Sequence, residues 1–215
     1  MKQYGQPVDR PTPEAAAMVA RARALTRDYY LSDFSDQAGR TRILRELFGK
    51  MGENVVIDTP LHCNYGKNIS IGNHVIINMN CTFVDDAKIM IGSRVLIASN
   101  VQFYTATHAP EPVDRLLPEC EKRGTLWFRT YAAPIVVADG VWIGGGAIIL
   151  PGVTIGENSV IGAGSVVPRS IPANCVAVGN PCRPIRFFSE QELRQGGDAA
   201  DELSGTAASS VRDGR

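Results

Sequence analysis

The amino-acid sequence predicts an all-β protein built as a parallel β-helix, with an N-terminal helical hairpin and a protruding loop. Three observations lead to this fold class: a six-residue apolar repeat over residues 135–183, a matching repeat that begins near Val55, and an interruption of the repeat at 104–134. A period of six fits neither the 3.6-residue period of a helix nor the alternation of a flat strand. It is typical of a β-helix in which each hexad supplies one short strand and one corner.

The C-terminal repeat is the more regular of the two. The apolar residues that begin its successive hexads are Val137, Ile143, Ile149, Ile155, Ile161 and Val167. Glycine often follows the repeating isoleucine, as at 143–144, 155–156 and 161–162. We expect each aliphatic side chain to point into a shared interior and the glycine beside it to permit the turn. The Gly-rich turns of a β-sandwich are the alternative, but sandwich strands are not expected to keep phase over six hexads.

Composition narrows the class of protein. With 215 residues, 44% of them hydrophobic, the chain can fill the core of one main domain. Lys plus Arg and Asp plus Glu number 22 each, so no overall basic field attracts nucleic acid or anionic lipid. Five cysteines without a C-x-x-C pair argue against a disulfide framework and a zinc ribbon. Without a signal segment or a long apolar window, we expect a cytoplasmic protein with reduced thiols and no membrane partner.

Residues 1–54 are expected to form an N-terminal helical segment. Residues 1–11 are polar and predict loose chain, after which Thr12 is the expected N-cap of a helix over 13–30. A second helix is expected to begin at Ser35 or Asp36. Its apolar stripe consists of Ile43, Leu44, Leu47 and Phe48, and Gly49 is expected to end it. We interpret this hairpin as a cover for the first coil.

The β-helix itself is expected to span residues 55–188. Its earlier inward positions are Ile57, Ile71, Ile77, Phe83, Ile91, Ile97 and Phe103, with two inserted residues placed at Ile89–Met90. Residues 104–134 lack the hexad phase and are rich in proline, charge and aromatic residues, which predicts a functional loop. Residues 189–215 predict a short helix capped by Ser189 and a disordered tail.

Segments beside the repeat resemble a known enzyme family. The YTATH segment at 104–108, the VWIGGG segment at 141–146 and the PGVTIG segment at 151–156 resemble the maltose, galactoside and nodulation O-acetyltransferases of the hexapeptide-repeat superfamily. The likeness runs from Arg42 to Arg183, roughly two thirds of the chain. It implies a left-handed parallel β-helix, a homotrimer with active sites between neighbouring subunits, and acetyl-CoA as co-substrate. No metal is implied, because the closely spaced histidines of the carbonic-anhydrase branch are missing here.

His108 matches the catalytic histidine of that family. Transfer of an acetyl group from a thioester to an alcohol needs a base for the hydroxyl and hydrogen-bond donors for the oxyanion that forms. Histidine is the natural base near neutral pH. His62 and His74 lie within coils among Asn and Gly, where a surface histidine is the ordinary explanation.

Three residues match the acceptor side of the family's site. Asn78 and Asp86 match positions that hold the acceptor sugar, and Asn64 stands at a position that is often Asp or Ser in relatives. Their polar groups suit sugar hydroxyls when they converge in one cleft. Each is alternatively a corner residue that satisfies its own turn. Asp85 and Asp86 do not form an acid/base pair in this interpretation, because adjacent strand residues point to opposite faces.

The donor side is expected just after the loop and in the last coils. The residues that match CoA-binding positions are Trp142, Gly145, Ala163, Pro168, Arg169, Arg183 and Arg186. The resemblance assigns the backbone N–H of Gly145 to acetyl-CoA and to the oxyanion, and glycine allows that approach. The arginines suit the phosphates of CoA, with a solvated surface arginine as the alternative.

The sequence therefore predicts an acetyl-CoA-dependent O-acetyltransferase that acts on a sugar or a related small acceptor by direct attack, without an acyl-enzyme. Acetylation of an amino sugar or a xenobiotic by the same fold is one alternative, and a non-catalytic trimeric β-helix scaffold is another. The loop aromatics Trp127, Phe128 and Tyr131, with Leu116, are expected either to line the acceptor site or to pack against a neighbouring subunit.

Overall fold

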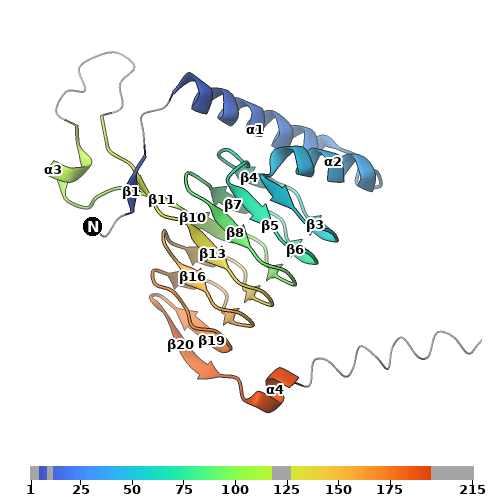
Figure 1. The fold of residues 1–215 in the computed structure, drawn as a ribbon, viewed down its shortest axis with the longest axis vertical. Coiled ribbons are helices and arrows are strands. Elements are labelled where there is room, and N and C mark those ends of the chain that lie inside the picture. The colour runs from blue at the N-terminus through green and yellow to red at the C-terminus, as the bar shows by residue number, and fades with distance from the viewer. Residues whose placement is uncertain (1–4, 9–11, 118–126, 195–215) are drawn as a thin grey trace, which may run out of the picture.

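The computed structural model describes residues 5–8, 12–117 and 127–194. Most of these residues form stacked coils of a parallel β-helix, with one short strand of each coil in each of three sheets (Figure 1). The predicted parallel β-helix is therefore confirmed. The predicted disordered tail falls at residues outside the described part of the chain.

The three sheets of the β-helix are built from strands that recur once per coil. The first sheet contains β2 (Lys50–Met51), β5 (Ile69–Ile71), β8 (Ile89–Ile91), β13 (Ile135–Val137) and β16 (Thr154–Ile155). The second contains β3 (Val55–Ile57), β6 (Val75–Ile77), β9 (Leu96–Ile97), β14 (Trp142–Ile143), β17 (Val160–Ile161), β19 (Cys175–Gly179) and β20 (Cys182–Phe187). The third contains β4 (Leu61–Cys63), β7 (Cys81–Val84), β10 (Gln102–Tyr104), β15 (Ile148–Ile149) and β18 (Val166–Val167). Pairing is parallel except between β19 and β20.

The interior is the column of apolar side chains that the repeat predicts. The six hexad residues from Val137 to Val167 are at most 1% exposed, and the seven earlier inward positions from Ile57 to Phe103 are at most 4% exposed. Phe83 and Phe103 stack on successive coils, with ring centroids 4.8 Å apart. Burial of the inward aliphatic and aromatic side chains of each strand is the main source of stability for such a coil.

The coils differ in length. Met51 pairs with Ile71 and Ile69 with Ile89, so the early coils take 20 residues. Val136 pairs with Thr154, so the coil after the loop takes 18, and Val160 pairs with Val176, so the last one takes 16. The prediction that two residues are inserted at Ile89–Met90 is wrong, because both belong to β8 and pair on either side. The register instead places the extra residues in the corner at 84–88, and in the equivalent corner at 64–68.

The two N-terminal helices cover the first coil (Figure 1). α1 (Pro13–Leu31) begins after Thr12, whose Oγ1 accepts a hydrogen bond from Ala15 N, and α2 (Gln37–Leu47) begins after Asp36, which caps it in the same way. The Tyr29 hydroxyl donates to the carbonyl of Ile57 at 2.6 Å, which ties α1 to the coil. Gly49 is required by contact, because a Cβ there would lie 2.4 Å from the carbonyl oxygen of Lys67.

The protruding loop leaves the β-helix after β10. A small antiparallel sheet lies at the base of the loop and consists of β11 (Ala106–Thr107), β12 (Tyr131–Ala132) and β1 (Gln6–Pro7) (Figure 1). The short helix α3 (Pro112–Arg115) lies within the loop. The prediction that residues 1–11 are loose is wrong for β1, which uses its backbone to pair with β12. Polar composition did not reveal this because edge pairing needs only main-chain groups.

The last coil ends in the β19–β20 hairpin and the short helix α4 (Glu190–Arg194). Ser189 caps α4 as predicted, since its Oγ accepts from the amide of Glu192 at 3.3 Å. Within the described residues, no helix has the length and apolarity needed to cross a membrane. The described cysteines, Cys63, Cys81, Cys175 and Cys182, are all free thiols.

Candidate active site

His108 lies at the start of the protruding loop, directly after β11. The antiparallel pairing of β11 with β12, and of β12 with β1, holds the two ends of the loop together at this point. The His108 side chain is exposed. The predicted base therefore stands at the surface, where a small molecule can reach it.

Two contacts fix the ring of His108. Its Nδ1 atom lies 2.8 Å from the carbonyl oxygen of Arg129, and the ring of Phe128 meets it at 87° with 5.1 Å between centroids. Because a carbonyl oxygen can only accept, Nδ1 must carry the hydrogen of this bond. In the neutral imidazole Nε2 then holds the lone pair, which is the arrangement that a general base requires.

Two arginines that the sequence analysis did not select hold the base of the loop. The amide of Arg129 donates to the carbonyl of Arg115 at 2.7 Å, and its guanidinium reaches two carbonyls of α3 at 3.2 and 3.3 Å. The guanidinium of Arg115 donates to the carbonyls of Ala109 and Pro110, just after His108. An arginine in a charged loop gives no sequence signal for such a role.

The structure brings Asn64 and Asp86 together. Asn64 follows β4, Asp86 follows the neighbouring strand β7, and the Asn64 Nδ2 group donates to Asp86 Oδ2 at 2.9 Å. β10, the next strand of the same sheet, leads through β11 to His108. The three residues therefore lie along one edge of the β-helix, which we call the first edge.

Asp85 points the other way from Asp86 and is fully buried. Its Oδ1 accepts from the amides of Asn64 and Tyr65, each at 2.9 Å, while Oδ2 is buried without a hydrogen-bond partner among the described residues. Burial raises the pKa of the Asp85 carboxyl to about 6, although the amide donors of Tyr65 and Asn64 act in the opposite direction. The divergence of the two carboxylates agrees with the sequence-based prediction, which assigned Asp85 no role.

Asn78 lies on a different edge of the β-helix. It follows β6 in the second sheet, and both its amide N and its Nδ2 donate to the carbonyl of Ile97 at 2.9 Å. Gly145 and Ala163 follow β14 and β17 of the same sheet. One chain therefore does not gather the predicted acceptor residues, because Asn78 shares this second edge with Gly145 and Ala163, which are predicted to bind the donor.

The amide of Gly145 differs from its neighbours. The amides of Gly144 and Gly146 donate to carbonyls of adjacent coils at 2.8 and 3.0 Å. Within the described part of the chain, the Gly145 amide donates to no oxygen. It is thus available to an outside acceptor, as an oxyanion donor must be.

The remaining predicted donor residues divide between the sheets. Trp142 lies on the outer face of β14 and is 49% exposed. Pro168 and Arg169 follow β18, on the first edge and further along from His108. Arg183 and Arg186 lie in β20, where Arg186 pairs with Glu192 at 2.6 Å and stacks over the ring of Phe188.

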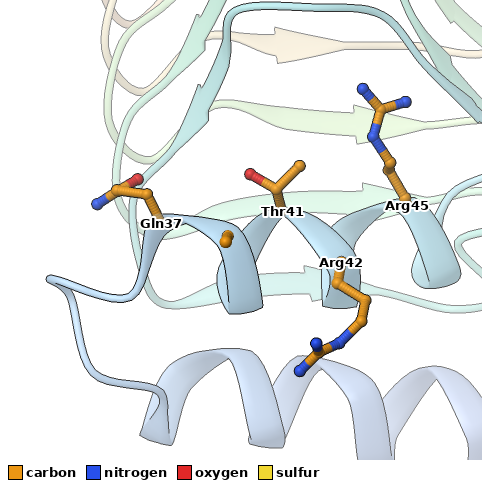
Figure 2. Close-up of a pocket in the computed structure, with 5 residues that line it drawn as sticks. Gln37, Thr41, Arg42 and Arg45 are labelled. Carbon is orange, nitrogen blue, oxygen red and sulfur yellow. The ribbon is translucent and has the colours of Figure 1, made fainter.

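A shallow cavity lies elsewhere, on the outer side of α2. It has a volume of about 540 Å³, and Figure 2 shows the residues that line it: Gln37, Ala38, Thr41, Arg42 and Arg45. Arg45 is already paired with Glu53 at 2.7 Å. No predicted site residue lines this cavity, and among the described residues no three His, Cys, Asp or Glu side chains gather as metal ligands.

Comparison with known proteins agrees with these features. Residues 134–169 match the bacterial transferase hexapeptide family (six repeats), and residues 9–52 match the maltose acetyltransferase hexapeptide capping motif. The galactoside O-acetyltransferase of Escherichia coli is 41% identical over 172 residues, which is 80% of this chain and 80% of that protein.

Solved structures give the same result. A galactoside acetyltransferase in complex with coenzyme A is 38% identical with a TM-score of 0.75, covering 85% of this chain and 86% of that one. A hexapeptide-repeat acetyltransferase from Vibrio cholerae, complexed with acetyl-CoA, is 38% identical with a TM-score of 0.74, covering 83% and 91%. With the repeat, the helical cap and the YTATH histidine in place, the chain belongs to the maltose and galactoside acetyltransferase family of hexapeptide-repeat proteins.

Proposed function

We propose that this protein transfers the acetyl group of acetyl-CoA to a hydroxyl of a sugar or a related small acceptor, with His108 as the general base. The observation that carries the proposal is the bond from His108 Nδ1 to the carbonyl of Arg129, because it leaves Nε2 as the basic nitrogen. Solved structures of relatives of similar size, bound to CoA or acetyl-CoA, support acetyl-CoA as the acetyl donor.

The chemistry needs one base and one oxyanion donor. Nε2 of His108 removes the proton of the acceptor hydroxyl as its oxygen attacks the thioester carbonyl carbon. The negative charge that forms on the carbonyl oxygen is stabilised by the amide of Gly145. Collapse of this intermediate breaks the carbon–sulfur bond. The imidazolium of His108 then donates its proton to the thiolate of CoA, which restores the neutral base.

The acceptor is held, in this proposal, by polar groups at the first edge. The hydrogen bond between Asn64 and Asp86 orients both side chains. A carboxylate and an amide side by side offer the acceptors and donors that vicinal hydroxyl groups need. Asn78 contributes from the second edge of an adjacent subunit.

The site is complete only between subunits. His108 and Asn78 lie on different edges of one chain, so a second copy must bring its second edge to the first edge of its neighbour. The outer face of the second sheet carries a row of half-exposed apolar residues in register: Val56, Ile76, Leu96 and Trp142. Such a row favours burial against another copy, and a ring of such contacts closes as the proposed homotrimer.

The donor occupies, in this proposal, the groove that this contact creates. Trp142 and Ala163 would border the pantetheine arm, and Pro168 would offer its carbonyl and ring. Arg169, Arg183 and Arg186 are the candidates for the phosphates of CoA. We further infer a cytoplasmic location, which the free state of the described cysteines supports.

Release of the CoA thiol tests the proposal. The parent protein is assayed with acetyl-CoA and a panel of galactosides, maltose, amino sugars and aryl alcohols, beside His108→Ala and the exposed-histidine control His62→Ala. We expect His108→Ala to lower kcat at least about a hundredfold while His62→Ala stays within about twofold. Equal turnover by His108→Ala and the parent would refute the base, and thiol release with amino sugars alone would favour N-acetylation.

A further inference from the structure

Two buried polar side chains occupy the same corner on successive coils. Asp85 and Thr105 are both fully buried and directly follow β7 and β10, which pair with Val84 opposite Tyr104. A polar group inside a column of isoleucine and phenylalanine costs free energy unless it is hydrogen-bonded. The burial of two polar side chains at this corner therefore needs an explanation other than apolar packing.

Asp85 ties its own corner to the one before it. Its Oδ1 accepts from two consecutive amides, those of Asn64 and Tyr65, and its carbonyl accepts from Asn68 Nδ2 at 2.7 Å. These bonds fix the backbone on which the Asn64 side chain stands. The same turn of chain directs Asp86 outward to meet Asn64 Nδ2.

Thr105 ties this corner to the one that leads to His108. Its Oγ1 donates to the carbonyl of Val84 at 2.7 Å and accepts from the amide of Ala87 at 2.9 Å. Its carbonyl accepts from the amide of Ala133, in the returning end of the loop. Three residues later the chain reaches His108, so an unbroken series of bonds joins the acceptor pair to the base.

A charge is not needed merely to join two corners. In the C-terminal coils the buried hydroxyl of Ser159 does this, since it donates to the carbonyl of Pro172 at 2.7 Å and accepts from the amide of Cys175. Asp85 instead keeps a carboxylate with one buried oxygen without a partner among the described residues. A carboxylate accepts two amides more strongly than a hydroxyl does.

We propose that Asp85 is a positioning residue for the acceptor: by holding the corner at 64–65 through Oδ1, and acting with Thr105, it sets the Asn64–Asp86 pair relative to His108. This inference rests on the proposed function, because it assigns the pair to the acceptor. Asp85 touches no substrate in this account. It acts through Asn64 and Asp86.

The experiment measures kcat, the KM for the acceptor, the KM for acetyl-CoA and the melting temperature. It compares the parent with Asp85→Ala, Asp85→Asn and the matched control Ser159→Ala. We expect Asp85→Ala to raise the acceptor KM about tenfold and the KM for acetyl-CoA less than twofold. Asp85→Asn retains an oxygen in the Oδ1 place and should recover the acceptor KM to within about threefold of the parent. Ser159→Ala should lower the melting temperature and leave both KM values unchanged.

A double-mutant cycle separates positioning from general damage. If Asp85 acts through Asp86, Asp85→Ala adds less than about twofold to the acceptor KM in an Asp86→Ala background. If Asp85→Ala does not fold, Asp85→Ser, whose shorter and uncharged side chain holds the two amides less firmly, should show the same selective rise at about threefold. An unchanged acceptor KM in Asp85→Ala, or an equal rise in both KM values, overturns this inference but leaves the proposed function standing. A parent that releases no thiol with any acceptor overturns the proposed function and this inference together.

Discussion

The Nδ1 atom of His108 lies 2.8 Å from the carbonyl oxygen of Arg129, 21 residues further along the chain. The residue that is proposed to do the chemistry is thus oriented by the returning arm of the loop and not by the β-helix alone. Any change that moves this arm should alter proton transfer before it alters binding of the donor.

Substitution of Phe128 tests this dependence. Its ring packs perpendicular to the His108 ring, so Phe128→Ala should loosen the imidazole and lower kcat by about tenfold, with the KM for acetyl-CoA little changed. Steady-state kinetics provide the measurement, with Phe34→Ala, an exposed aromatic on the helical segment, as the control. An unchanged kcat in Phe128→Ala would mean that the loop arm does not orient the base.

The Asp85 carboxyl should make stability depend on pH. Its pKa is raised from 3.8 to about 6 by burial, so the folded state binds this proton more tightly than the unfolded state. The stabilisation is full below pH 3.8 and is lost as the pH rises through 6. The titratable groups that neighbour the Asp85 carboxyl are those of Asp86, Cys63 and Tyr65.

Urea denaturation of the parent and of Asp85→Asn at pH 5 and pH 7.5 measures this effect. The free energy of unfolding of the parent, relative to Asp85→Asn, should fall by roughly 1 kcal/mol between the two pH values. A difference that is constant, or that grows with pH, would contradict the raised pKa.

The arginines proposed for CoA should not contribute equally. The ion pair with Glu192 occupies Arg186, and the hydrogen bonds from Arg186 and Ser189 together lower the pKa of that carboxyl to about 2. Arg169→Ala should therefore raise the KM for acetyl-CoA about tenfold, and Arg186→Ala less than about threefold. Repeating the assay with 3′-dephospho-acetyl-CoA shows which phosphate is lost. A larger effect at Arg186 would mean that it leaves Glu192 to bind the donor.

One corner of the coil requires a left-handed backbone. Arg94 and Gly140 occupy equivalent places on successive coils, with φ of 55° and 70°. A Cβ at Gly140 would also lie 2.5 Å from Asn158 Oδ1. Gly140→Ala should lower the free energy of unfolding by about 1–2 kcal/mol, whereas Arg94→Gly should cost nothing, because glycine adopts this conformation freely. Chemical denaturation compares the two, and equal losses would contradict the argument.

The local sequence pattern was sufficient to predict the coils of the β-helix. The hexad residues are buried as predicted because alternate side chains of each short strand point inward, and apolar side chains fill the column there. The position of the inserted residues was predicted wrongly, since the repeat counts residues but does not show which of them pair. Strand β1 was missed because its pairing depends on backbone groups that every residue has.

The sequence by itself determined the repeat, the helical cap, the family and the residue types that the chemistry needs. Only the tertiary structure decided how these residues are placed: Asn64 is bonded to Asp86 on one edge, Asn78 and Gly145 share another edge, and His108 is bonded to the carbonyl of Arg129. The reason is physical. Periodicity in a chain reports which side chains face the interior, whereas an active site depends on the register between coils and on the path of a loop, and both are set by long-range contacts.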